Sequence, residues 1–268
     1  MNRRIFLLSA GCASQRVFAA ETALQRGKRV IDETVKTLGG DAFLRVENRV
    51  ESGRVYSFFR QELAGLSLAK IYTRYLPRPT PLVPGQLLVR ERQAFGKGEP
   101  DVVLFNETGA WEVTFRGAQP LDDKRYANYK DSTLRNFFYI LRQRLGEPEL
   151  TFYSQGSDFY ENRPVEIVDI TDAQNLTVTV YIDRLNKFPI RQVFKRRNEE
   201  FKDFDTEVTL FAKYRDVGGG VQWPYDVRRE RNGEKTFEIY ADSVEINKNL
   251  TDDLFTLPAN VKMLPKAK

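Results

Sequence analysis

Apolar positions near the start of the chain recur every three or four residues, which is typical of an amphipathic helix. The helix is expected to begin near Glu21 and to end at the Gly39-Gly40 pair, because glycine favours helix termination. Its predicted apolar stripe contains Leu24, Val30, Ile31, Val35 and Leu38.

After Asp41 the pattern changes to the alternation of β-strands. Gly53 predicts a bulge or bend in the first strand, and Asn232-Gly233 is a favoured hairpin turn. The proline-dense segment 76–85 predicts a stiff surface loop, because proline cannot donate to a ladder. The expected strands are 46–59, 66–75, 87–95, 102–105, 110–115, 150–153, 165–171, 176–183, 190–197, 206–216, 221–231 and 236–246.

Two of these strands have clear alternation. Trp111, Val113 and Phe115 share one face, so the face of Glu112 and Thr114 is expected to meet solvent. In the later strand, the apolar face carries Leu176, Val178, Val180 and Ile182.

A second amphipathic helix is expected over 122–145. Two acidic residues open it and Arg142 and Arg144 close it, which matches the helix dipole. Its apolar stripe, which must face an apolar surface, contains Tyr126, Tyr129, Leu134, Phe137, Phe138, Leu141 and Leu145. The stripe either covers a sheet or partly plugs a cavity.

Residues 1–19 have the pattern of an export signal, with early arginines, an apolar stretch and small residues before Ala20. Arg3-Arg4 resembles a twin-arginine signal. Cleavage after Ala19 removes three arginines and no acid, so the formal net charge of +5 falls to +2. The alternative is a lipid anchor at Cys12, because Ser9-Ala10-Gly11-Cys12 resembles a lipobox. We expect residues 20–268 to form a single domain in the periplasm, or at a membrane if Cys12 is acylated.

The amino-acid composition limits the catalytic and metal-binding chemistry that the chain can carry out. The chain has no histidine and one cysteine, which excludes Ser-His-Asp and Cys-His nucleophile pairs, histidine-ligated metals, intramolecular disulfides and cysteine-cluster zinc sites. We find no motif that assembles carboxylates, lysines or tyrosines for catalysis. The expectation is therefore no catalytic residue, no metal and no cofactor. Glu199 and Glu200 follow the basic run 195–197, and Glu230 lies within the run 228–231, so nucleic acid is not an expected partner. Transient contact with anionic membrane headgroups is an alternative.

Several short segments along the chain form a recognisable series: Leu38-Gly39-Gly40-Asp41-Ala42, Tyr181-Ile182-Asp183, Phe188-Pro189-Ile190-Arg191, Gly220-Val221-Gln222-Trp223-Pro224, Asn232-Gly233, Asn247 and Asp252-Asp253-Leu254-Phe255-Thr256-Leu257-Pro258. In their order and spacing, these segments resemble the outer-membrane lipoprotein-sorting family, the LolA/LolB-like periplasmic carriers. They extend over nearly all of the chain after residue 19, and none performs chemistry. The 76–85 loop has no counterpart in the family pattern.

The resemblance implies a mainly β, α+β fold: a strongly curved antiparallel sheet forms a half-barrel, and helices cover its concave face around an apolar cavity. It also implies a carrier that binds a lipid or the acyl chains of a lipoprotein. The alternatives are an envelope regulatory module that binds a protein partner, and an enzyme that uses carboxylate, tyrosine or lysine chemistry. The candidate cavity residues are Trp111, Val113, Phe115, Phe137, Phe138, Leu141, Val178 and Val180, and an ordinary filled core is the alternative for each.

Overall fold

The computed structural model describes residues 20–266, in which thirteen strands form one antiparallel sheet. Its order is β6-β5-β4-β3-β2-β1-β13-β12-β11-β10-β9-β8-β7, so β6 and β7 are free edges and the sheet is not closed. The strands are β1 Asn48–Phe59, β2 Glu62–Tyr75, β3 Val89–Phe95, β4 Asp101–Asn106, β5 Gly109–Thr114, β6 Gly117–Pro120, β7 Thr151–Tyr160, β8 Arg163–Thr171, β9 Thr177–Asp183, β10 Pro189–Asn198, β11 Asp203–Asp216, β12 Gln222–Arg231 and β13 Glu234–Ile246.

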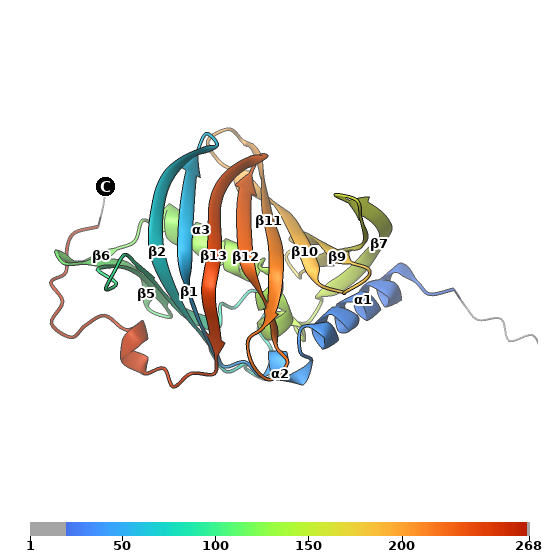
Figure 1. Cartoon of the computed structure of the whole chain (residues 1–268), viewed down its shortest axis with the longest axis horizontal. Coiled ribbons are helices and arrows are strands. Elements are labelled where there is room, and N and C mark those ends of the chain that lie inside the picture. The colour runs from blue at the N-terminus through green and yellow to red at the C-terminus, as the bar shows by residue number, and fades with distance from the viewer. Residues whose placement is uncertain (1–19, 267–268) are drawn as a thin grey trace, which may run out of the picture.

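The chain builds this sheet as two meanders joined by one long-range pairing. Strands β1 to β6 follow one another, strands β7 to β13 do the same, and β13 pairs with β1. The sheet curves strongly, and the helices lie on one side of it (Figure 1). That side is called the inner face. The predicted curved half-barrel is confirmed, and the predicted export signal and Cys12 lie outside the described residues.

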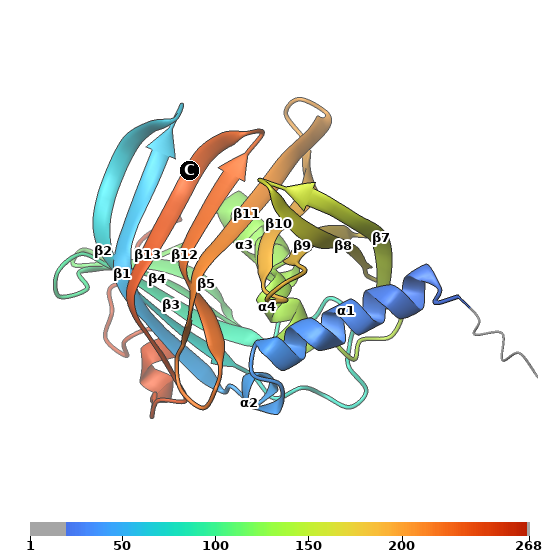
Figure 2. The same ribbon diagram turned by 45° about the vertical axis from the view of Figure 1, so that its right-hand side comes forward.

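The helical segments are α1 Ala23–Thr37, α2 Asp41–Leu44, α3 Asp123–Leu134, α4 Phe137–Tyr139, a π-helical turn Ile140–Arg144 and a 3-10 turn Asp252–Phe255. Helix α1 packs along β7 and β8, near the right-hand end of the sheet in Figure 2. Thr22 caps it by accepting a hydrogen bond from the Gln25 amide, and the helix ends before Gly39-Gly40 as predicted.

The predicted apolar stripe of α1 is confirmed except at its first residue. Val30, Ile31, Val35 and Leu38 are buried, whereas Leu24 is 53% exposed. Gly27 is buried instead, because the helix approaches β7 so closely that a Cβ there would lie 2.4 Å from the Phe152 carbonyl oxygen. The prediction missed this approach because it counted only apolar side chains.

The prediction of one helix over 122–145 is wrong, because the chain turns at Arg135 and Asn136. Asn136 caps α4 by accepting a hydrogen bond from the Tyr139 amide at 3.1 Å. No residue of α3 is buried, whereas nearly every residue of the next segment is. Since a continuous helix presents only one stripe, the chain must break for the segment after Asn136 to enter the core.

Most strand predictions are confirmed, with one reversed face. The predicted bulge lies between Ser52 and Gly53, where the register of β1 against β13 shifts. In β5, however, Glu112 points to the inner face and pairs with Arg125 of α3, so Trp111 and Val113 lie on the outer face. The short strand β6 was not predicted.

The proline-dense segment forms a loop between β2 and β3, as expected, and the helices hold it. Gln143 of the π-helical turn donates to the carbonyls of Leu76 and Leu88, at 2.9 and 2.7 Å. The Tyr139 hydroxyl accepts a hydrogen bond from the Leu88 amide at 2.7 Å. The α4 segment and the π-helical turn therefore hold both ends of the loop.

The main core lies between four helical segments (α1, α2, α4 and the π-helical turn) and the half of the sheet formed by β7 to β13. Phe138 is at its centre and contacts the rings of Phe43, Phe211 and Trp223, with centroid distances of 4.7 to 6.5 Å. It is 2% exposed. The core is a filled aromatic cluster in this half of the sheet.

Replacing Phe138 with alanine is expected to lower the free energy of unfolding by about 3–5 kcal/mol, because it leaves a cavity among aromatic rings. The matched control is Phe115→Ala, since Phe115 is 88% exposed and its truncation should change stability by less than about 0.5 kcal/mol. Urea denaturation of both variants measures the difference. Equal losses in the two variants would contradict this description of the core.

Candidate functional site

The structure brings five of the eight predicted cavity residues together. Phe137, Phe138, Leu141, Val178 and Val180 belong to one cluster and are each at most 2% exposed. Trp111 and Val113 lie on the outer face of β5, and Phe115 follows the end of that strand in a turn. The five are packed against helices and the other three lie apart from them, so ligand contact by any of the eight stays a prediction.

A second apolar cluster lies on the inner face, and sequence reasoning missed it. Val55, Ala69 and Ile239 are buried in it, and the partly buried residues that pack against them are Ile71, Phe95, Val227 and Phe237. All seven come from β1, β2, β3, β12 and β13. Val227 also packs against the main core, so the two clusters share the same face of the sheet. We call these seven residues the strand cluster.

The strand cluster differs from the main core in what covers it. Within residues 20–266, no apolar side chain from a helix or loop belongs to the strand cluster, whereas helices supply much of the main core. Figure 2 shows the upper parts of β1, β2, β12 and β13 extending beyond α1, α2 and α4. Helices therefore supply apolar side chains to the main core, whereas the strand cluster is built from strand side chains alone.

Helix α3 lies on the inner face and is held from two sides of the curved sheet. In the middle of the helix, the Tyr129 ring stacks on Phe105 of β4, with centroids 3.5 Å apart. Near its C-terminal end, Arg196 of β10 donates to Asp131 at 3.0 Å, and Arg135 donates to the Lys195 carbonyl at 2.6 Å. Figure 1 shows α3 behind β12 and β13, on the helix-bearing side.

Charged side chains lie on the inner face beside the strand cluster. Glu51 is buried, and Arg49 pairs with it at 3.6 Å while its guanidinium lies 4.3 Å from the centroid of the Trp223 ring. Burial raises the pKa of Glu51 and of Glu91, because a desolvated carboxylate favours its neutral form. Desolvation by the surrounding protein lowers the pKa of Arg229, because it disfavours the charged guanidinium.

These charges also show how strongly the sheet curves. Glu91 lies on β3 and Arg229 on β12, with β2, β1 and β13 between them. Nevertheless the Arg229 charge lowers the pKa of Glu91 against the effect of burial, and the Glu91 charge raises that of Arg229. This mutual effect of the two charges agrees with a sheet whose curvature brings β3 and β12 closer together than a flat sheet would.

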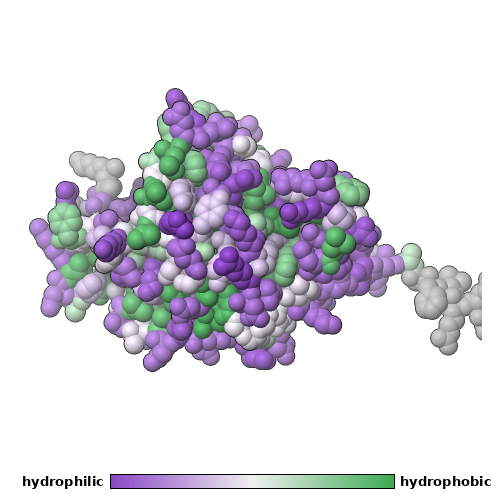
Figure 3. Space-filling view, in the orientation of Figure 1, coloured by the Kyte–Doolittle hydropathy of each residue, from purple (hydrophilic) through white to green (hydrophobic). Residues whose placement is uncertain are grey.

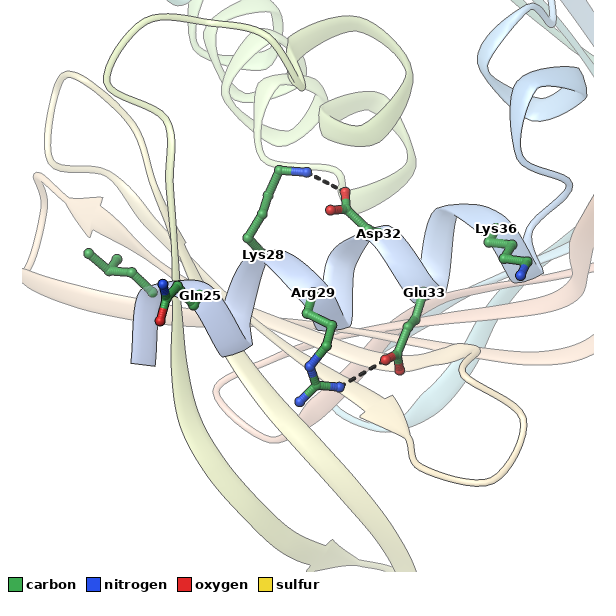
Figure 4. A pocket seen from close by; sticks show the side chains of 7 residues that line it. Gln25, Lys28, Arg29, Asp32, Glu33 and Lys36 are labelled. Carbon is green, nitrogen blue, oxygen red and sulfur yellow. Dashed lines mark hydrogen bonds and ion pairs between the residues drawn. The ribbon is translucent and has the colours of Figure 1, made fainter. Parts of the chain in front are cut away.

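Two surface hollows lie away from the strand cluster. The larger, about 650 Å³, runs along the exposed face of α1 (Figure 4). Four of its charged side chains already pair within the helix, Arg29 with Glu33 at 2.8 Å and Lys28 with Asp32. A smaller hollow of about 200 Å³ lies on the outer side, between Arg90, Trp111 and Phe255. Neither contains a residue of the strand cluster.

Residues 20–266 contain no group of three or more acidic or cysteine side chains arranged to hold a metal ion. Over the same residues, no helix has the length and apolar character needed to span a bilayer.

The comparisons with known proteins rest on structure, since no family model and no curated protein matches the chain. A DUF1329 family protein from Desulfovibrio piger superposes with a TM-score of 0.56 at 11% identity, over 86% of this chain and 97% of that one. A domain from Vibrio parahaemolyticus named for outer membrane lipoprotein sorting gives 0.50 at 11% identity, over 87% and 97%. These likenesses confirm, at the level of the fold, the predicted similarity to the lipoprotein-sorting half-barrels.

Glu51→Gln is expected to flatten the pH dependence of stability. Because the folded pKa of Glu51 is raised, the folded state binds a proton more tightly than the unfolded state, so stability falls as pH rises from the ordinary glutamate pKa through the raised one. Relative to wild type, the variant should therefore gain unfolding free energy between pH 5 and pH 8, measured by urea denaturation.

The control is Glu245→Gln, which removes the same charge from an exposed position. Lys248 lowers the pKa of Glu245, so that group stays ionised throughout pH 5–8 in both states. Its variant should show no change of relative stability in this range. Parallel profiles for the two variants would contradict the assignment of a buried, destabilised Glu51 carboxylate.

Proposed function

We propose that this protein is a non-catalytic carrier that binds an acyl chain of a lipid or lipoprotein against the strand cluster and passes it on. The observation that carries the proposal is that seven apolar side chains from five adjacent strands share the concave face, with no apolar side chain of a helix among them. Binding a chain there removes apolar surface from water and contributes about 25 cal/mol per Å² removed. No bond has to be made or broken.

The dimensions of the strand cluster suit an extended chain. Five neighbouring strands, spaced about 4.8 Å apart, extend over roughly 19 Å along the curved sheet. Strong curvature brings side chains from both ends of this arc toward the bound chain, as the coupling between Glu91 and Arg229 indicates. The described fold, shared with a domain named for lipoprotein sorting, supports a carrier rather than an enzyme.

The carrier would act in the periplasm, after export directed by residues 1–19. If Cys12 is retained and acylated, the same domain would act while tethered to a membrane. Both assignments rest on the sequence pattern of this segment.

A specific observation favours a second candidate, the binding of an envelope protein. Large apolar side chains are exposed at the ends of two hairpins, with Phe59 and Leu63 beside the β1–β2 turn and Phe201 and Phe204 beside the β10–β11 turn. Apolar side chains gather near this upper end of the sheet in Figure 3. Exposed apolar groups of this kind mark partner contacts. Loss of a stoichiometric partner from pull-downs with Phe59→Ser and Phe201→Ser would support it.

Acyl binding is tested by titrating the purified protein with a dodecyl-chain fluorescent probe and by solvent extraction and mass spectrometry of protein isolated from envelopes. We expect near-stoichiometric binding. Phe95→Ser should weaken it by about tenfold, because it removes an aromatic wall from the strand cluster.

The matched control is Phe204→Ser, which makes the same exchange on the outer face of β11, where the ring is 52% exposed. This variant should bind the probe like wild type. A protein that carries no extracted lipid and does not bind the probe would overturn the carrier proposal and favour the protein-partner candidate.

A further inference from the structure

Arg229, on the inner face, differs from the neighbouring arginines in the partners of its guanidinium. Arg229 follows Val227 by two residues on β12 and is opposite Phe237 of β13, so its side chain points to the same face as the strand cluster. Its guanidinium lies 5.4 Å from the centroid of the Phe237 ring. Within residues 20–266, its guanidinium makes no hydrogen bond and no ion pair.

The neighbouring arginines, in contrast, are all paired. Arg228 pairs with Glu230 at 3.0 Å on the outer face, and Arg231 pairs with Glu207 at 2.9 Å. Arg196 holds Asp131 at 3.0 Å and also approaches Glu207 at 3.4 Å. Glu207 is thus already shared between two arginines when it faces Arg229.

Arg229 is accessible to solvent although protein surrounds it. Its side chain is exposed, yet the curved sheet encloses it enough for desolvation to lower its pKa, the opposing carboxylates Glu91, Glu207 and Glu51 acting in the other direction. A guanidinium in such a place gains from an anion that makes direct hydrogen bonds, since charge-assisted pairs strengthen as water is excluded.

We propose that Arg229 receives the anionic headgroup of a single-chain amphiphile whose acyl chain lies on the strand cluster. This inference rests on the proposed function and names the ligand class: a negatively charged carboxylate or phosphate joined to an alkyl chain. The planar guanidinium presents a fork of donors that matches either group. The contact with Phe237 places the guanidinium directly beside the strand cluster, on which the acyl chain would lie.

The test compares four ligands with the same twelve-carbon chain and different headgroups: dodecanoate, dodecyl phosphate, dodecanol and dodecyltrimethylammonium. Calorimetric titration of the wild-type protein should give at least about tenfold tighter binding for an anionic ligand than for dodecanol, as expected for hydrogen bonds to a charged group. The ammonium ligand should bind more weakly than dodecanol. The ranking of carboxylate against phosphate distinguishes a fatty acid from a phosphate-bearing lipid as the source.

Three variants separate the headgroup contact from general effects. Arg229→Gln should abolish the anionic preference while leaving dodecanol affinity within about twofold, because the strand cluster is intact. Arg229→Lys should retain part of the preference. The control Arg228→Gln removes the adjacent positive charge from the outer face and should behave like wild type, and urea midpoints show that each variant is folded.

The outcomes divide cleanly. If wild type binds anionic and neutral ligands equally, or if Arg229→Gln weakens all four ligands in parallel, the headgroup proposal is overturned while acyl binding stands. An anionic preference that survives in Arg229→Gln overturns it as well. Failure of wild type to bind any of the four ligands overturns the proposed carrier function itself.

Discussion

The pairing of β1 with β13 is the constraint on which the rest of the structure depends. It is the only contact that joins the two meanders of the described chain into one sheet, and it closes across almost 200 residues of sequence. At its lower end Asn48 donates to the Lys248 carbonyl and accepts from the Lys248 amide, both at 2.8 Å. These side-chain bonds fix the register beyond the ladder itself, so a slip of one residue would reverse every face.

The bulge in this pairing also produces the curvature that the proposed site needs. A Cβ at Gly53 would lie 2.1 Å from the Tyr240 carbonyl oxygen, so only glycine permits the close approach of the two strands. Bulges increase the local twist and bend of a sheet. Beyond the bulge, Val55 is opposite Ile239, and this pair forms the middle of the strand cluster. The β1–β13 pairing that joins the two meanders therefore also supplies the central residues of the proposed acyl site.

The sequence allowed the strands, the Gly53 bulge and the proline-dense loop to be predicted, because each has a local signal. The break between α3 and α4 has none: Arg135 and Asn136 fit a helix, and only the burial of the segment from Phe137 onward makes the chain turn. The face of β5 failed for a related reason. Trp111 is apolar, but the pairing of Glu112 with Arg125 of α3 decides which side faces the helices. The strand cluster escaped notice because its members are spread over five strands, and only their register brings them together.

An inner face that places a partly exposed apolar cluster beside desolvated charges lowers the stability of the folded chain. Apolar helix side chains packed into the strand cluster, as those of α4 pack in the main core, would stabilise the protein, and so would a direct partner for Arg229. Local arrangements that sacrifice stability are expected where a protein must bind something. The sheet supplies opposite charges, Glu91 and Glu51, that balance Arg229 across the concave side without neutralising it by contact. These distant opposite charges stabilise the charged guanidinium when the site is empty. Its hydrogen-bond donors stay available to an incoming anion, whereas a direct salt bridge would occupy them.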